Sequence, residues 1–365
     1  ELGSLRLWLP RSTLSLEVAG TIGFSGNAPA VELAGGWTAL RWPLSGDPSL
    51  ESPLGTFSLQ GSLPYAFDVQ AHAGAPTLQG APEARFSAAG SIERERLVLD
   101  RLDGDVLGGH LAGSGSVSWT GEQAWTARLD ARDLDIATVR PDLPGRVSAV
   151  GTVEGRGFSP QSPWSARLAS LSGTVAGRAL TGRGEVEYRD GVYDLREVRI
   201  ANGASHIDLN GRWGSTVDLR WSANVRTLAL LHPDLAGELV SSGRARGSSS
   251  RPRVEAELRA RGLQFAGIAA QSVDAEVDVD ATDSHESRVE IQATNIDLGP
   301  VQLDAARFDA HGLLAGHDLG LEFSSPGGGA QGLPSVRGRV GLRGVYATAR
   351  HAWHGSLEQA SITFP

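Results

Sequence analysis

The sequence predicts an all-β protein, an extended antiparallel sheet built from tandem repeats with one long apolar face. Three observations support this fold class: many short runs alternate apolar and polar residues, 47 of the 365 residues are glycine, and no long stretch has helical periodicity. Alternation with a period of two places all apolar side chains of a strand on one face. Such a face is unstable in water, so the sheet must form a sandwich, a barrel or a curled trough.

The alternation is clearest in residues 125–132, 217–226 and 254–261, and shorter runs cover 67–73 and 273–280. Asp190-Gly191 and Asn202-Gly203 are typical of the tight turns that join antiparallel strands. Runs of this length imply about 25–30 strands. One short helix is expected between residues 133 and 139. Pro141 would end it, because proline cannot continue a helix.

A seven-residue pattern, bounded by glycine at both ends, begins at Gly55, Gly145, Gly237 and Gly338. The copies follow at intervals of 90, 92 and 101 residues, and the middle two share a preceding Pro-Asp-Leu tripeptide. A period near ninety residues indicates an array of multi-strand units. We therefore expect one continuous β-trough, residues 1–365, with approximate repeat units 1–100, 101–200, 201–300 and 301–365 and no separable catalytic domain.

Composition excludes several classes of function. The net charge of −9 and the lack of a basic stripe argue against a nucleic-acid partner. The absence of cysteine excludes disulfides, thiolate metal ligands and cysteine nucleophiles. The sequence contains no methionine, even at position 1, so we expect a fragment or processed product. No apolar run reaches the ~18–20 residues that span a bilayer, and any membrane anchor would lie outside this fragment.

The motifs that could carry chemistry are weak. The acidic segment 278–286 resembles a calcium loop but lacks the mid-loop glycine, so we expect the polar face of a strand running into a turn. His351 and His354 offer two imidazoles without a third ligand nearby in the sequence. No phosphate loop, nucleophile elbow or zinc-protease motif is present. We expect no catalytic residues, no metal site and no cofactor: the chain is not an enzyme.

Spaced Trp, Gly, Leu and Pro residues give the chain a resemblance to a known family. The segments are Trp37, Arg41-Trp42-Pro43-Leu44, Ser52-Pro53-Leu54-Gly55, residues 102–113, Trp119, Trp125 and Pro141-Asp142-Leu143-Pro144-Gly145. They resemble the middle periplasmic portion of the TamB family, which is related to AsmA-like and bridge-like lipid transfer proteins.

The resemblance implies a β-taco, a curled sheet whose concave face is an apolar groove. It also implies a periplasmic location in a Gram-negative bacterium, in a protein anchored to the inner membrane. It further implies a TamA-like outer-membrane barrel as partner, and roles in phospholipid movement and outer-membrane protein assembly. The inner-membrane anchor and the contact with the barrel would both lie outside this fragment.

These inferences lead to a predicted function: a non-enzymatic scaffold that shelters phospholipid acyl chains in a hydrophobic groove between the inner and outer membranes. The groove candidates are the alternating apolar residues Phe57, Leu59, Phe67, Val69, Leu97, Leu99, Leu111, Val117, Trp125, Leu129, Leu168, Val217, Leu219, Trp221, Val254, Leu258, Val277 and Val301. For tryptophans such as Trp125 and Trp221, core packing and groove lining are equally consistent with the pattern.

Three alternatives remain open at the level of sequence. A β-solenoid that forms a surface or polysaccharide-binding module would repeat every ~20–25 residues. A chaperone-like scaffold for outer-membrane protein assembly would use the same apolar face for protein clients. An outer-membrane barrel also has alternating strands, but four tyrosines in 365 residues are few for its aromatic girdles.

Overall fold

The structure is a computed structural model that describes residues 2–8, 14–24, 28–42, 47–48, 50–74, 84–299, 301–326, 335–347 and 352–364. These residues form 23 strands of 7 to 15 residues and two short 3-10 helices. The strand pairs within the two units below are all antiparallel, which confirms the predicted all-β antiparallel fold and excludes the parallel strand stacking of a β-solenoid. In the described part of the chain, no helix is long and apolar enough to cross a membrane.

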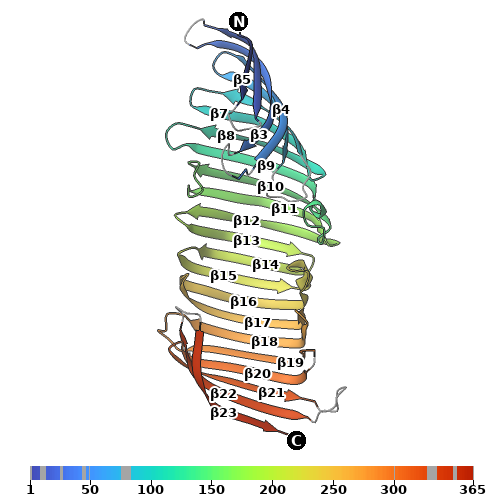
Figure 1. The fold of residues 1–365 in the computed structure, drawn as a ribbon, viewed down its shortest axis with the longest axis vertical. Helices are drawn as coiled ribbons and strands as arrows, with labels where there is room; N and C mark the ends of the chain where they lie inside the picture. The colour runs from blue at the N-terminus through green and yellow to red at the C-terminus, as the bar shows by residue number, and fades with distance from the viewer. Residues whose placement is uncertain are drawn as a thin grey trace. The chain divides into compact units, whose positions relative to one another are not determined.

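The chain divides into two compact units, Glu1–Asp190 and Gly191–Pro365. In unit 1 the strands are β1 (Leu2–Trp8), β2 (Ser15–Gly23), β3 (Ala30–Trp42), β4 (Leu50–Gly61), β5 (Tyr65–Gly74), β6 (Ala84–Ile92), β7 (Arg96–Val106), β8 (Gly109–Ser118), β9 (Ala124–Asp135), β10 (Gly145–Arg156), β11 (Trp164–Val175) and β12 (Arg178–Arg189). Each strand pairs with its neighbours in chain order, and the described residues of β1 and β12 do not pair with each other. Unit 1 is therefore an open sheet (Figure 1).

Unit 2 repeats this arrangement. Its strands are β13 (Val192–Asn202), β14 (Ser205–Trp213), β15 (Thr216–Val225), β16 (Ala236–Ser248), β17 (Arg251–Phe265), β18 (Ile268–Asp280), β19 (Ser287–Asp297), β20 (Gln302–Leu313), β21 (Gly316–Ser325), β22 (Val336–Ala347) and β23 (Ala352–Thr363). They also pair in chain order, and among the described residues β13 does not pair with β23. Unit 2 is an open sheet as well.

The two 3-10 helices are separated by the spacing of the sequence repeat. η1 (Ile136–Thr138) follows β9, and η2 (Leu228–Leu230) follows β15, 92 positions later. η1 lies within the stretch that was expected to be helical, and the Asp135 carboxylate caps it by accepting a hydrogen bond from the amide of Ala137 at 3.0 Å. The repeated Pro-Asp-Leu tripeptide follows each helix, so a repeated sequence accompanies a repeated backbone feature.

Two-residue turns join eight pairs of consecutive strands, and five of these turns contain a glycine with positive φ. Gly203 has a φ of +59° as the first central residue of the turn between β13 and β14, and Asn202 precedes it as the last residue of β13. Three turns have left-handed φ at both central residues although the first residue is neither Asn nor Asp: Leu107-Gly108, Ala176-Gly177 and Ala266-Gly267. Paired positive φ values are characteristic of the type I′ hairpin turn, whose twist matches that of the flanking strands.

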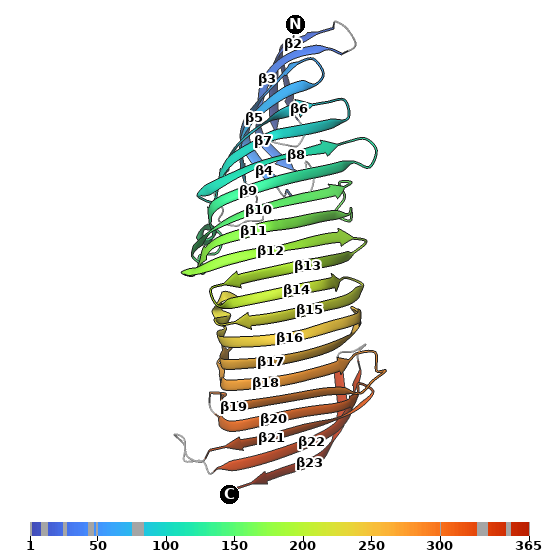
Figure 2. The same cartoon turned by 180° about the vertical axis from the view of Figure 1, so that it is seen from behind.

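Bulges interrupt the alternation inside several strands. The register shifts where two apolar residues are three positions apart instead of two: between Leu99 and Leu102, between Leu168 and Leu171 and, in unit 2, between Leu195 and Val198. A bulge adds one residue to its strand and bends it, and the strands in Figure 2 are visibly curved. Because the extra residue restores the phase of the pattern, the apolar face continues past each bulge.

Neither unit has a packed core of large side chains. The buried apolar residues are small or medium in size, such as Val217 and Val225 at 4% and 3% exposure, and no large side chain is fully buried in the described part of the chain. A sandwich would bury its aromatic residues between two layers. The apolar face of each unit therefore has no covering layer among the described residues.

Candidate functional site

The strand register aligns the apolar residues of unit 1 into continuous rows across the sheet. One row runs through β3 to β12 without a polar residue: Leu33, Leu59, Phe67, Gly90, Leu99, Gly115, Ala127, Val153, Ala166 and Val186. Adjacent strands lie about 4.8 Å apart, so ten strands carry this row over roughly 40 Å. The register thus converts a local period of two into a long apolar surface.

Unit 2 has an equivalent row. It runs through β13 to β23 as Val198, Leu209, Trp221, Gly243, Ala256, Val277, Val289, Ala310, Leu319, Leu342 and Leu357. Parts of this face are open to solvent, since Leu357 is 61% exposed and Leu321 in the next row is 39% exposed. An exposed apolar surface of this extent is unusual for a protein surface without a ligand or partner.

Glycines on the apolar face provide room for aromatic rings. A Cβ atom added to Gly55 would lie 2.1 Å from Cζ2 of Trp37, and one added to Gly243 would lie 2.3 Å from Cζ2 of Trp221. In each case the glycine is the direct cross-strand partner of the aromatic residue, so the ring lies over a strand that has no side chain at that point. The same holds for the pairs Phe67 and Gly90, Phe86 and Gly104, Trp125 and Gly155, and Phe323 and Gly338.

This arrangement gives six of the glycines a role on the apolar face, whereas the sequence pattern assigned glycine to turns. Rings that lie over glycines do not project far from the sheet, so the apolar face is low in relief. The indole N–H groups are also satisfied within the protein: Trp37 donates to Oγ of Ser52 at 2.9 Å, and Trp221 donates to Oγ of Ser241 at 3.1 Å. These tryptophans therefore present apolar ring surface without an unpaired polar group.

An apolar concavity lies over β7, β8 and β9 of unit 1. We call it the apolar cavity. Its volume is about 360 Å³, at the lower end of the range for small-molecule sites. It is lined by Leu97, Leu99, Leu102, Ser114, Gly115, Ser116, Val117, Trp125, Thr126, Ala127, Leu129 and Phe158.

Phe158 comes from the loop between β10 and β11 and is 59% exposed. The loop is held near the cavity because the indole N–H of Trp125 donates to the carbonyl of Gly157 at 3.0 Å. The amide of Gly157 in turn donates to the carbonyl of Gln123, also at 3.0 Å. A strand residue of the face thus positions a loop aromatic at its margin.

The structure places seventeen of the eighteen groove candidates on strands, all on the apolar face of their unit. Five of them line the apolar cavity together: Leu97, Leu99, Val117, Trp125 and Leu129. The unit 2 candidates on β15, β17 and β18 are neighbours in the register, for example Leu219 beside Ala245 and Val254.

Val301 is the exception. It was grouped with the alternating strand residues, but it lies in the loop before β20 and is 45% exposed. The amide of Leu298 donates to the carbonyl of Val301 at 2.9 Å, just beyond the last paired residues of β19 and β20, Asp297 and Gln302. Val301 therefore lies outside the strand pairing that forms the apolar rows.

Sequence reasoning missed two kinds of residue on this face. Leu102, Leu171 and Val198 lie just after bulges, where simple alternation loses its phase; a three-residue spacing between apolar residues was the available signal. Phe158 belongs to a loop, and no periodicity marks it. The glycines opposite aromatics could be recognised only once the register was known.

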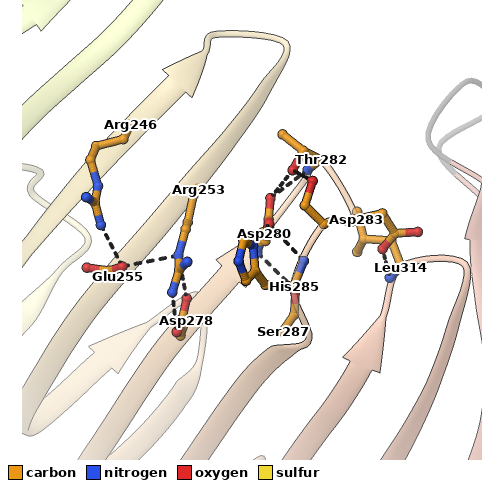
Figure 3. A network of polar contacts seen from close by, with 11 residues as sticks. Arg246, Arg253, Glu255, Asp278, Asp280, Thr282, Asp283, His285, Ser287 and Leu314 are labelled. Carbon is orange, nitrogen blue, oxygen red and sulfur yellow. Dashed lines mark hydrogen bonds and ion pairs between the residues drawn. The ribbon is translucent and has the colours of Figure 1, made fainter.

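The opposite face of unit 2 carries charged side chains in cross-strand ion pairs. Glu255 lies between Arg246 and Arg253, at 2.8 and 3.1 Å, and Arg253 also pairs with Asp278 at 3.0 Å (Figure 3). The hydrogen bond to Asp278 raises the pKa of Arg253. These pairs are partly exposed, so they fix the register more than they add stability.

The calcium-like acidic segment forms a capped turn, as expected from the strand-end interpretation. Asp280 at the end of β18 is only 3% exposed, and its carboxylate accepts hydrogen bonds from the amides of Thr282 and His285 at 2.9 and 3.1 Å (Figure 3). The hydrogen bond from the Thr282 hydroxyl, followed by these amide bonds, lowers the pKa of Asp280 to about 2. Asp283 accepts from the amides of Leu314 and Ala315, which ties this turn to the turn between β20 and β21.

The histidine pair is only partly within the described residues. His351 lies outside them, and His354 is exposed on β23. The nearby Trp353 donates its indole N–H to Nε2 of His317 at 2.8 Å. The described residues contain no group of three or more His, Cys, Asp or Glu side chains that could hold a metal ion.

Comparison with known proteins supports the family resemblance independently. A family model described as "TamB, N-terminal domain" matches residues 12–365, where the sequence resemblance had suggested a middle portion of the family. The "Translocation and assembly module subunit TamB" of Haemophilus influenzae is 20% identical over 289 residues, which cover 78% of this chain and 21% of the relative. The chain thus spans about a fifth of the length of that relative. No solved structure gives a significant match. Because the family model covers nearly the whole sequence, the chain belongs to the TamB family.

Proposed function

We propose that this chain is part of a non-enzymatic, lipid-conducting scaffold in the periplasm of a Gram-negative bacterium, within a protein anchored to the inner membrane. Its apolar face would shelter phospholipid acyl chains on their way between the inner and outer membranes, and so serve outer-membrane biogenesis. One observation carries the proposal: continuous apolar rows cross each unit, and no layer covers them in the described part of the chain. Membership of the TamB family agrees with it.

The physical basis is the transfer of hydrocarbon out of water. Each methylene group that leaves water contributes about 0.8 kcal/mol, so a face that contacts two acyl chains offsets most of the cost of removing a lipid from a bilayer. Each strand contributes one residue to an apolar row, and neighbouring strands lie about 4.8 Å apart. An acyl chain can therefore shift from one strand to the next without losing contact. Low relief keeps the barriers between positions small, and no covalent step is needed.

The headgroup must remain hydrated while the acyl chains are covered. The apolar face ends at the strand termini, where turns such as 281–286 carry Thr, Asp, Ser and His side chains. We propose that headgroups lie along these edges, in contact with water. Curling of the sheet across its strands, favoured by the bulges, would then close the acyl chains into a trough.

The partner proposed for the full-length protein is a TamA-like outer-membrane barrel, reached through a region outside this chain. The name of the Haemophilus influenzae relative, a subunit of the translocation and assembly module, supports such an assembly. A chaperone-like role for unfolded outer-membrane proteins is a second candidate, because an open apolar face could also bind apolar polypeptide segments.

The direct test is mass spectrometry of material that copurifies with the chain from a Gram-negative host. We expect phospholipid in the wild-type preparation and a reduced amount in Leu129→Arg, which places a charge in the apolar cavity. Arg128→Gln, one residue away on the polar face, is the matched control and should retain the wild-type amount. Delipidated protein that stays soluble and binds no fluorescent fatty acid would overturn the proposal, and copurifying polypeptide without lipid would favour the chaperone-like role.

A further inference from the structure

A second concavity lies on the polar face of unit 2, on the opposite side of the sheet from the apolar rows. We call it the cationic hollow. Its volume is about 440 Å³, and it extends across the five strands β19 to β23. The polar-face residues of these strands form its floor and walls, and three of them are arginines: Arg307, Arg337 and Arg339.

The hollow exists because small side chains occupy its centre. Ala305 and Ser324 are direct cross-strand partners, and Arg337 is the next residue in the same row. Arg307 and Arg339 lie two positions along their strands from Ala305 and Arg337, about 7 Å away on the same face. The long side chains therefore surround a floor formed by a methyl group and a hydroxyl.

The charges of the hollow are unusual for this protein. The chain as a whole carries a net charge of −9, yet the lining residues include three arginines and only one carboxylate, Glu322. Arg339 pairs with Glu322, and Arg307 lies 3.5 Å from Glu290 outside the lining. Among the described residues, no carboxylate lies within ion-pair distance of Arg337. Arg337 is part of the lining of the hollow. A cationic surplus is thus concentrated in a concave site.

We propose that the cationic hollow binds a phosphate group, with Arg337 and Arg339 as its principal ligands and Arg307 and the Ser324 hydroxyl in support. The planar guanidinium group donates two parallel hydrogen bonds to phosphate oxygens, and two or three such groups around one concavity match the several acceptors of a phosphate. A carboxylate ligand would use fewer of these donors. The site is separate from the acyl-binding face, since it lies on the other side of the same strands.

The phosphate could belong to a lipid headgroup or be free in solution, and the chemistry of recognition is shared. The test is calorimetric titration of the whole chain, at low ionic strength, with inorganic phosphate, glycerol 3-phosphate and a short-chain phosphatidic acid. Low ionic strength is needed because salt screens partly exposed arginines. Arg337→Gln and Arg339→Gln are the test variants. Arg220→Gln, on the polar face of β15, is the matched control.

We expect saturable binding of at least one phosphate probe, weakened about tenfold or more by either test variant and unchanged by the control. Glycerol 3-phosphate as the better ligand would indicate an esterified headgroup, and inorganic phosphate as the better ligand would indicate free phosphate. Extra affinity for phosphatidic acid that survives Arg337→Gln would belong to the apolar face. No saturable binding of any probe, or equal affinities in Arg337→Gln and Arg220→Gln, would overturn the proposal. Because Arg337 and Arg339 are both exposed, their replacement should leave the melting temperature unchanged.

Discussion

The apolar cavity of unit 1 and the cationic hollow of unit 2 are concavities of similar size, about 360 and 440 Å³, built on the same antiparallel lattice. In both, small residues on central strands create the space: Gly115 and Ala127 in the cavity, Ala305 and Ser324 in the hollow. The flanking side chains differ, since Leu and Trp surround the first and Arg surrounds the second. The position of small residues in the register therefore sets the shape, and the face of the strand sets the chemistry.

Replacing a glycine that lies under an aromatic ring of the apolar face should have the largest effect on stability. We expect Gly243→Val to destabilise unit 2 by about 3 kcal/mol, because the added carbons would overlap the ring of Trp221 and approach the carbonyl of Glu255, 2.7 Å from the new Cβ. Gly341→Ala is the control, because its Cβ would meet Cβ of Gln359 at an ordinary 3.5 Å. Chemical denaturation measures both. Equal stability of the two variants would show that the glycine does not make room for the ring.

Acid should lower the stability of unit 2 through Asp280, at the end of β18. Hydrogen bonds hold the pKa of Asp280 at about 2, below its ordinary value of 3.8. A lowered folded-state pKa contributes stability above pH 3.8, and this contribution is lost as the pH falls toward 2. We expect Asp280→Asn to cost about 2 kcal/mol at pH 7 and to reduce the loss of stability between pH 4 and pH 2. Denaturation curves at several pH values test this, and an unchanged acid dependence in the variant would contradict it.

A charge on the apolar face should affect ligand binding more than folding. We expect Leu129→Arg to cost about 1–2 kcal/mol in stability, because the face is open and the long side chain can reach water. Its affinity for a fluorescent fatty acid should fall at least tenfold, since the guanidinium occupies the apolar cavity. Thermal melts and probe titration provide the two readouts. Complete unfolding would indicate a closed core, and unaltered binding would show that the cavity is not used.

The smallest effect is expected on the polar face away from the hollow. Arg220 lies directly opposite Arg244, so two like charges face each other across β15 and β16. Arg220→Glu replaces this with an opposite-charge pair, and we expect a gain of no more than about 0.5 kcal/mol. Fatty-acid binding should not change. A large loss of stability in the denaturation curve would mean that this face is covered in solution.

The face on which each strand residue lies could be predicted from the sequence, because it depends only on the local alternation of apolar and polar residues. The run 125–132 fixes which side chains of β9 share a face, and seventeen of eighteen candidates were placed on strands accordingly. Register is not local: the pairing of Trp221 with Gly243 depends on a turn and a 3-10 helix between them. The bulge between Leu99 and Leu102, the loop residue Phe158 and the cationic hollow were missed for the same reason, since each depends on neighbouring strands.

The most direct test of the proposed contact between the apolar face and acyl chains is a photo-crosslinking scan along β9. A photoreactive amino acid would be placed singly at positions 125 to 132 of the full-length protein, in cells labelled with radioactive phosphate. We expect phospholipid adducts at positions 125, 127, 129 and 131, and little or none at positions 126, 128, 130 and 132. The reason is that the two sets of positions lie on opposite faces of the strand. Adducts without this alternation, or adducts only with polypeptide, would contradict the claim that the apolar face holds acyl chains.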